Sequence, residues 1–180
     1  MTRSRLLSLA ITLAAAGLPA ASLHAQQAPA RGWFVQAGAA EHANAINVGL
    51  TRDWRWQKQY SLGRVTGYWE GTLGRWFVQG RRDSTQVGLT PVLRLYPDAW
   101  RPGWFVEGGI GVNAISPRYD NGRKRFSTTF QFGDHAAVGK RFGAGQRQEW
   151  SLRLQHYSNA RIEQPNPGEN FLQLRYSRVW

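Results

Sequence analysis

The chain has 180 residues, contains no cysteine and carries a formal net charge of +12. The lack of cysteine excludes disulfide, zinc-finger and thiol chemistry. The positive charge favours a partner with many negative charges, such as nucleic acid or an anionic membrane surface. After residue 25 no continuous apolar run reaches the roughly 18 residues that a transmembrane helix needs, which excludes an ordinary helical membrane span.

The first 25 residues have the pattern of a secretory signal peptide. Two arginines precede an apolar run from Leu6 to Leu18, and Pro19 and the small residues Ala20, Ala21 and Ser22 follow it. The run is too short to span a bilayer. We therefore predict cleavage after Ala25 and one exported domain over residues 26–180. Because an exported chain does not meet nucleic acid, the membrane and its anionic lipid become the expected partners.

The remaining sequence contains eight runs in which apolar and polar residues alternate, with turn residues between them. These runs cover residues 33–40, 46–53, 62–73, 85–96, 103–114, 126–138, 149–159 and 170–180. Their lengths suit tilted strands that cross a hydrocarbon layer, and in lipid only a closed barrel satisfies the backbone of every strand. We therefore predict an all-β fold, an eight-stranded antiparallel transmembrane β-barrel of a Gram-negative cell outer membrane.

The alternative is a soluble eight-stranded barrel of the lipocalin type, whose apolar faces would point inward. Charges on the polar faces favour the membrane barrel, because they could pair within a narrow lumen. These charged residues include Arg64, Glu70, Arg94, Glu107 and Arg153. The nine tryptophans lie mostly near the ends of the runs, as aromatic girdles do. The chain also ends in Trp180 after an alternating strand, which resembles the terminal strand of outer-membrane barrels.

An even number of strands places both ends of the barrel domain in the periplasm. The connections near residues 53–61, 98–102 and 143–148 are then periplasmic. The connections near residues 41–44, 74–84, 116–125 and 160–168 are then extracellular. Three of the outer connections are basic, which supports contact with phosphorylated lipopolysaccharide, although the periplasmic turns are basic as well.

The seventh run ends in a histidine and a serine two residues apart. The period of two places His156 and Ser158 on the same face as Leu152 and Leu154, at the height of the outer leaflet. Polar residues that face lipid are costly and invite a functional explanation. A serine and a histidine supply nucleophile and base for acyl transfer if an acid orients the imidazole. Alone, such a pair is more often an ordinary interface feature.

The residues around this pair resemble the lipid A 3-O-deacylase (PagL) family. The resemblance rests on His-Tyr-Ser-Asn-Ala at 156–160 and Pro-Asn-Pro-Gly-Glu-Asn-Phe at 165–171, with Gly-Tyr-Trp-Glu-Gly at 67–71, and covers essentially the whole exported chain. It implies an eight-stranded outer-membrane barrel that removes the ester-linked 3-hydroxyacyl chain of lipid A by a Ser/His/Glu triad. By this resemblance Ser158 is the nucleophile and His156 the base.

The resemblance implies that the acid lies just beyond the turn at residues 165–168. Glu169 is the expected acid, and Glu163 in the preceding loop is the second choice. In some family members the acid matches Asn170 instead. Alternation puts Asn170 on the face of the strand's leucines and Glu169 on the opposite face. Because alternation is loose at the first residue of a strand, we retain Glu169.

Acyl transfer also needs hydrogen-bond donors that are aimed at the developing oxyanion. The candidates for donating to the oxyanion or supporting its site are Asn159, Pro165, Asn166 and Gly168. Turn chemistry alone explains Asn166 and Gly168 equally well. The neighbours Asp134 and His135 are expected to be structural. No residues have metal-ligand spacing, so we expect neither a metal nor a cofactor.

The sequence thus predicts an esterase that acts on lipid A from within the outer membrane. Two other functions stay open. A non-enzymatic small barrel would bind lipopolysaccharide or act as an adhesin and leave the mass of lipid A unchanged, whereas an acyltransferase barrel would increase that mass. The sequence also leaves a homodimer open.

Overall fold

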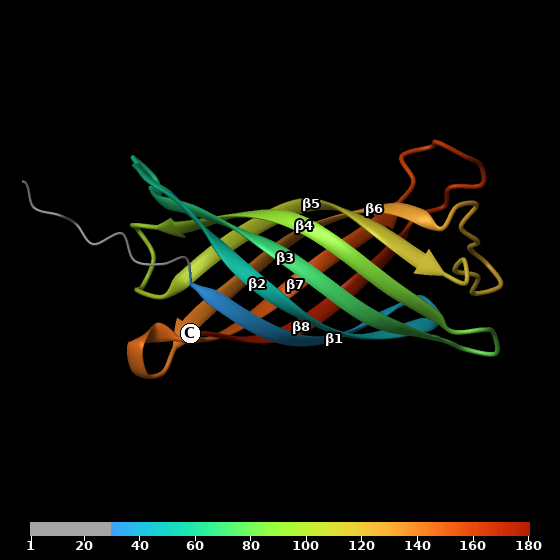
Figure 1. Cartoon of the computed structure of the whole chain (residues 1–180), viewed down its shortest axis with the longest axis horizontal. Helices are drawn as coiled ribbons and strands as arrows, with labels where there is room; N and C mark the ends of the chain where they lie inside the picture. The colour runs from blue at the N-terminus through green and yellow to red at the C-terminus, as the bar shows by residue number, and fades with distance from the viewer. Residues whose placement is uncertain (1–29) are drawn as a thin grey trace, which may run out of the picture.

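The computed structural model describes residues 30–180, and the predicted signal peptide, residues 1–25, lies outside this range. Eight antiparallel strands form a closed barrel in which β1 pairs with β8 (Figure 1). The strands are β1 (Arg31–Ala40), β2 (Ala43–Tyr60), β3 (Gly63–Val78), β4 (Ser84–Pro97), β5 (Trp104–Ser116), β6 (Phe130–Phe142), β7 (Gln148–Ser158) and β8 (Glu169–Val179), with the short 3-10 helix η1 (Ala144–Gln146) before β7. Within residues 30–180, no helix is long and apolar enough to cross a membrane.

The outer surface of the barrel is apolar. Leu50, Leu73, Ile110 and Leu154 each expose more than half of their surface, while their neighbours in sequence turn inward. A soluble barrel would show the reverse arrangement, because its apolar side chains would fill the interior. The predicted eight-stranded barrel with an apolar outer face is therefore confirmed.

Ion pairs cross the lumen. Arg153 donates to Glu70 at 2.8 Å and to Glu107 at 3.2 Å, and Arg175 also donates to Glu70. Arg94 bridges Glu107 and Glu149 at 2.7 and 2.8 Å. Each buried charge thus has a partner, as buried charges require. The predicted pairing across a narrow lumen is confirmed for these residues.

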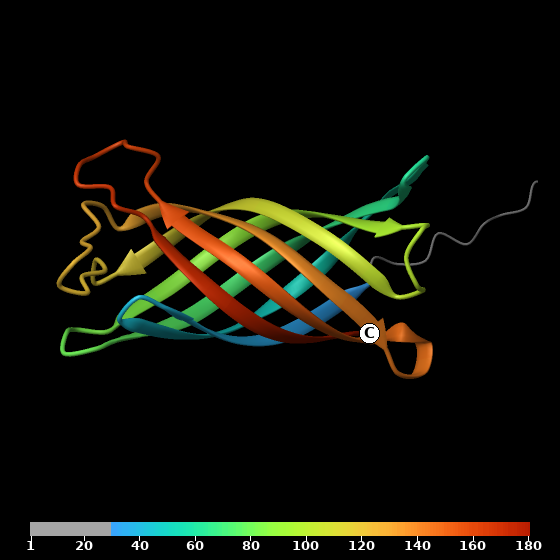
Figure 2. The ribbon, with the colours of Figure 1, turned by 180° about the vertical axis from the view of Figure 1, so that it is seen from behind.

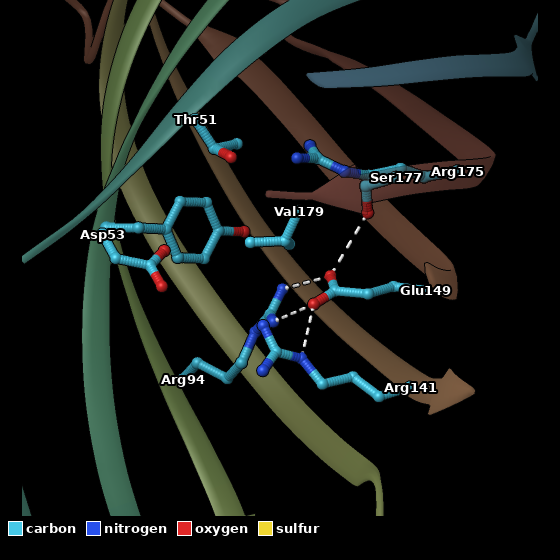
Figure 3. Close-up of a pocket in the computed structure, with 9 residues that line it drawn as sticks. Thr51, Asp53, Arg94, Arg141, Glu149, Arg175, Ser177 and Val179 are labelled. Carbon is cyan, nitrogen blue, oxygen red and sulfur yellow. Dashed lines mark hydrogen bonds and ion pairs between the residues drawn. The ribbon is translucent and has the colours of Figure 1, made fainter. Parts of the chain in front are cut away.

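At the end of the lumen where the β6–β7 turn lies, the pairs continue. Figure 3 shows the guanidinium groups of Arg94 and Arg141 converging on Glu149, which also accepts a hydrogen bond from Ser177 Oγ at 3.2 Å. Arg64 is an exception among the predicted lumen charges. It is exposed, and its guanidinium lies 4.4 Å from the ring centroid of Tyr96.

At the opposite end, an aromatic cluster fills the lumen below the loop 117–129. Trp76 packs at 4.8 Å from Tyr157 and 4.7 Å from Phe171, and the loop contributes Tyr119 and Phe126. Because Phe126 is drawn inward to this cluster, β6 begins at Phe130 rather than at residue 126 as expected. Trp76 is likewise fully buried and does not belong to an outer aromatic girdle.

Two strands extend further than the sequence predicts. The expected periplasmic connection at 53–61 is instead paired strand, because β2 and β3 resume their ladder at Gln57↔Thr66 after a register shift and continue to Tyr60↔Gly63. This hairpin projects beyond the barrel wall on the side of the C-terminus (Figure 1). The longer loops 117–129 and 159–168 lie at the other end (Figure 2). In outer-membrane barrels the longer loops are extracellular.

Candidate active site

His156 and Ser158 lie at the end of β7, next to the extracellular loops. Both are half-buried and have the outward parity of Leu152 and Leu154, as expected from the alternation. Two residues along a strand span about 7 Å between Cα atoms, a separation that an imidazole and a hydroxymethyl group can bridge when they lean toward each other. The structure therefore brings the predicted nucleophile and base to one outward-facing site.

Asn170 on β8 holds the imidazole from the other side. It is the cross-strand partner of His156, and its Oδ1 lies 2.7 Å from His156 Nδ1. Since an amide oxygen can only accept, this contact places the imidazole proton on Nδ1. Nε2 is then the unprotonated nitrogen that can take a proton from a serine hydroxyl.

Glu169 takes the opposite face of β8 and does not reach His156. Its side chain is 1% exposed and accepts hydrogen bonds from Lys124 Nζ at 2.9 Å and Tyr119 OH at 2.8 Å. The alternation of the strand holds from its first residue, so Glu169 points into the lumen and Asn170 points outward. This corrects the expected place of the acid: the side chain on His156 Nδ1 belongs to Asn170, and Glu169 anchors the loop 117–129.

Asn159 and Glu163 link the two long loops. The Asn159 side chain is buried and donates to the Glu163 carbonyl oxygen at 2.8 Å and to Ser127 Oγ at 2.9 Å. Ser127 Oγ also donates to the same carbonyl of Glu163 at 3.0 Å. Asn159 therefore points away from the outward face of Ser158, and Glu163 takes part through its backbone while its side chain is exposed.

The turn at 165–168 lies directly against the site. The backbone N–H of Asn159 donates to Asn166 Oδ1 at 3.0 Å, which fixes the Asn166 amide and leaves its Nδ2 group for another acceptor. Pro165 is exposed and has no N–H to offer. Gly168 has a φ of +65° and touches the imidazole: a Cβ at this position would lie 2.6 Å from His156 Cε1.

Replacing Gly168 with alanine should displace the His156 ring. The added methyl group meets both an unfavourable backbone conformation and the ring itself, so we expect the catalytic rate to fall by about 10- to 100-fold, as small misplacements of catalytic groups do. The rate of the ester hydrolysis that the sequence predicts, measured with the purified variant in detergent, tests the effect. Gly80→Ala is the matched control, since Gly80 also has a positive φ but has nothing within 4 Å of the added Cβ. Equal rates for the two variants would contradict the contact with His156.

Asp134 is a carboxylate on the outward face that the sequence reasoning left out of the site. It lies on β6 as the cross-strand partner of His156, so Asp134, His156 and Asn170 form one row over three strands. Phe132 pairs with Ser158 in the next row. The sequence contains a signal for this place, because Asp134 has the same parity as Phe130 and Phe132 and should therefore face outward with them. His135 faces the lumen instead, so the neighbours Asp134 and His135 do not form a pair.

Charges in the extracellular loops are paired close to the site. A hydrogen bond from Arg123 lowers the pKa of the Glu41 carboxyl, which therefore stays ionised at neutral pH. Burial raises the pKa of the Tyr119 phenol, and its hydrogen bond to Glu169 raises it further. Tyr119 is thus a neutral donor that helps Lys124 to hold the Glu169 carboxylate, and the loop 117–129 is tied to the first residue of β8.

Comparisons with known proteins show the family to which the chain belongs. The model of the family "Lipid A 3-O-deacylase (PagL)" matches residues 44–178. The lipid A deacylase PagL of Pseudomonas aeruginosa is 31% identical to this chain over 180 residues, which cover 96% of each chain. The lipid A deacylase PagL of Bordetella bronchiseptica is 29% identical over 158 residues, which cover 85% of this chain and 86% of that protein. The crystal structure of the outer membrane enzyme PagL superposes with a TM-score of 0.71 and 28% identity, covering 82% of this chain and 98% of that one. The chain therefore belongs to the lipid A 3-O-deacylase (PagL) family.

Proposed function

We propose that the protein is an outer-membrane esterase that removes the 3-O-linked 3-hydroxyacyl chain from lipid A of lipopolysaccharide. The row of His156 and Asn170 with Ser158 beside it carries this proposal, because the row lies on the outer face of the barrel near its extracellular end. Lipid A occupies the outer leaflet, so its ester bonds lie at this height. The relatives named as lipid A deacylases support the same substrate.

The proposed reaction is an acyl transfer through Ser158. Its Oγ attacks the ester carbonyl while His156 Nε2 takes the hydroxyl proton. We assign the oxyanion of the tetrahedral intermediate to the Asn166 Nδ2 group, because the bond from the Asn159 N–H to Asn166 Oδ1 holds this amide beside the residue that follows Ser158. His156 then returns its proton to the sugar oxygen as the ester bond breaks. Water hydrolyses the acyl-enzyme by the reverse proton movement, and a 3-hydroxy fatty acid leaves.

The acid of a catalytic triad both orients the imidazole and places a negative charge beside it. In this row the two tasks are divided between Asn170 and Asp134. Asn170 orients the imidazole through its 2.7 Å hydrogen bond but carries no charge. Asp134 on the other side of His156 carries the charge, and directly opposed side chains on neighbouring strands have Cβ atoms about 5 Å apart.

Asn170 variants test this division. Asn170→Ala removes the orienting bond and should lower kcat by about 100-fold, because the ring loses both its position and its Nδ1–H tautomer. Asn170→Asp has nearly the same shape, keeps an acceptor at the same place and adds a charge that stabilises the imidazolium, so its kcat should equal or exceed that of the wild type. Steady-state rates on detergent-dispersed lipid A measure both. If Asn170→Ala kept the wild-type kcat, Asn170 would not be the orienting residue.

The lipid A mass spectrum tests the function itself. Membranes of a Gram-negative host that produces the protein should contain lipid A lighter by one 3-hydroxyacyl chain than membranes of the same host without it. Unchanged lipid A would favour the lipopolysaccharide-binding or adhesin barrel, and heavier lipid A would favour an acyltransferase. The homodimer that the sequence leaves open stays a prediction, which sedimentation of the detergent-solubilised protein can test.

A further inference from the structure

Two arginines face each other on the outside of the barrel, at the end opposite to Ser158. Arg31 on β1 and Arg52 on β2 are direct cross-strand partners, and both are exposed with outward parity. Like charges in this arrangement repel each other. Within residues 30–180 neither arginine takes part in an ion pair. The pair therefore has a positive charge that this part of the protein does not fully neutralise.

A tryptophan flanks the arginine pair on each side. Trp180 exchanges backbone hydrogen bonds with Arg31 at 3.3 and 2.8 Å, and Trp69 on β3 is the cross-strand partner of Arg52. The order Trp180, Arg31, Arg52, Trp69 thus runs across four neighbouring strand segments. Tryptophan is characteristic of the boundary between headgroups and hydrocarbon. The two guanidinium groups therefore lie at the height of lipid headgroups in the periplasmic leaflet.

A groove begins at this row and leads toward the middle of the membrane. It has a volume of about 470 Å³, and its lining consists of Arg31, Gly32, Leu50, Thr51, Arg52, Trp69, Gly71 and Trp180. Leu50 pairs with Gly71, and a Cβ at Gly71 would have nothing within 4 Å. The groove thus has two arginines at its mouth and an apolar floor. No acidic side chain lines it, and the terminal carboxylate of Trp180 offsets one of the two positive charges.

We propose that this groove binds one anionic glycerophospholipid of the periplasmic leaflet. The lipid phosphate lies between Arg31 and Arg52, whose planar guanidinium groups suit phosphate oxygens and offset the repulsion between them. An acyl chain follows the gap over Gly71. A lipid with a cationic amine in its headgroup is disfavoured, because the amine would approach the same two arginines. Lipid A is excluded by position, since it occupies the other leaflet.

Native mass spectrometry of the detergent-solubilised protein with added phosphatidylglycerol or phosphatidylethanolamine of matched acyl chains tests this proposal. We expect phosphatidylglycerol to remain bound and to bind about tenfold or more tightly than phosphatidylethanolamine. The double variant Arg31→Gln/Arg52→Gln should lose about tenfold or more of that affinity, in line with the contribution of two basic residues at an anionic lipid surface. The matched control is Arg101→Gln/Arg147→Gln, which removes two exposed charges from turns at the same end of the barrel and should bind as the wild type does.

A second variant tests the contribution of the apolar gap to lipid binding separately from that of the two arginines. A Cβ at Gly71 would meet nothing within 4 Å, so we expect Gly71→Leu to place its side chain in the gap, keep both arginines and weaken phosphatidylglycerol binding while the barrel folds normally. The heat-dependent shift of the folded barrel on electrophoresis gels checks folding of every variant. Equal retention of the two lipids, wild-type binding by the Arg31/Arg52 variant, or preferential retention of lipid A at these arginines would each overturn the proposal. None of these readouts depends on esterase activity.

Discussion

Replacing Ser158 with alanine is expected to stop the release of 3-hydroxy fatty acid, with a fall in kcat of about 10⁴-fold or more. The reason is that no other group in the row can form the acyl-enzyme: the carboxylate of Asp134 and the imidazole of His156 would have to activate water directly. Removal of the nucleophile in serine hydrolases has effects of this size or larger. Single-turnover release of the fatty acid from detergent-dispersed lipid A measures the rate.

Ser151→Ala is the matched control for this variant. Ser151 lies on the same strand, β7, but points into the lumen. The same loss of a hydroxyl there should leave kcat within about twofold, because residues away from catalytic groups contribute little to rate. Wild-type deacylation by the folded Ser158→Ala protein would remove Ser158 from the mechanism, and equal losses in both variants would point to a general effect on the barrel.

The second large effect is expected in stability, from Glu70→Ala. Glu70 is the shared acceptor of Arg153 and Arg175, and all three side chains are at most 3% exposed. Removing the carboxylate leaves two guanidinium groups buried without this partner, so the free energy of unfolding should fall by about 3–5 kcal/mol. Reversible urea unfolding in detergent micelles, followed by tryptophan fluorescence, measures the change.

An exposed ion pair provides the comparison. Arg75 and Asp83 lie 3.4 Å apart with side chains 47% and 32% exposed. Arg75→Ala removes this pair and leaves the bond from the Val78 N–H to Asp83 Oδ1 in place, so it should change the free energy of unfolding by about 1 kcal/mol or less. If the two variants were destabilised equally, burial of the Glu70 pairs would not matter to the barrel. The Gln substitution at Glu70 should lie close to the alanine variant, because it also removes the charge that both arginines need.

The alternation of side chains was sufficient to predict the barrel, its lipid face and the charges in its lumen apart from Arg64. Strand β7 shows why, since every second residue from Glu149 to Tyr157 is buried and the residues between them face outward. A period of two leaves only one register that puts Leu152 and Leu154 in lipid. The outward place of His156 and Ser158 follows from that register alone.

The ends of elements and the third member of the site were harder to predict. Phe126 continues the alternation of β6 but packs into the aromatic cluster, a long-range contact that local pattern does not contain. Glu169 is a carboxylate next to the position of the expected acid, so it was chosen for its charge. The alternation of β8 nevertheless puts Glu169 on the inward face. The Lys124 amine that holds Glu169 inside is 45 residues away in the sequence. The sequence gives the outward parity of Asp134, but its place beside His156 depends on the register of β6 against β7, which local pattern does not contain.

The filled lumen has a consequence for the cell envelope. Ion pairs such as Arg153–Glu70 bridge the interior, and the cluster around Trp76 closes the extracellular end beneath the loop 117–129. We therefore expect the described part of the barrel, residues 30–180, to conduct ions far less than an open porin does. A cell can therefore place many copies of this protein in its outer membrane and leave the permeability barrier against small toxic solutes intact.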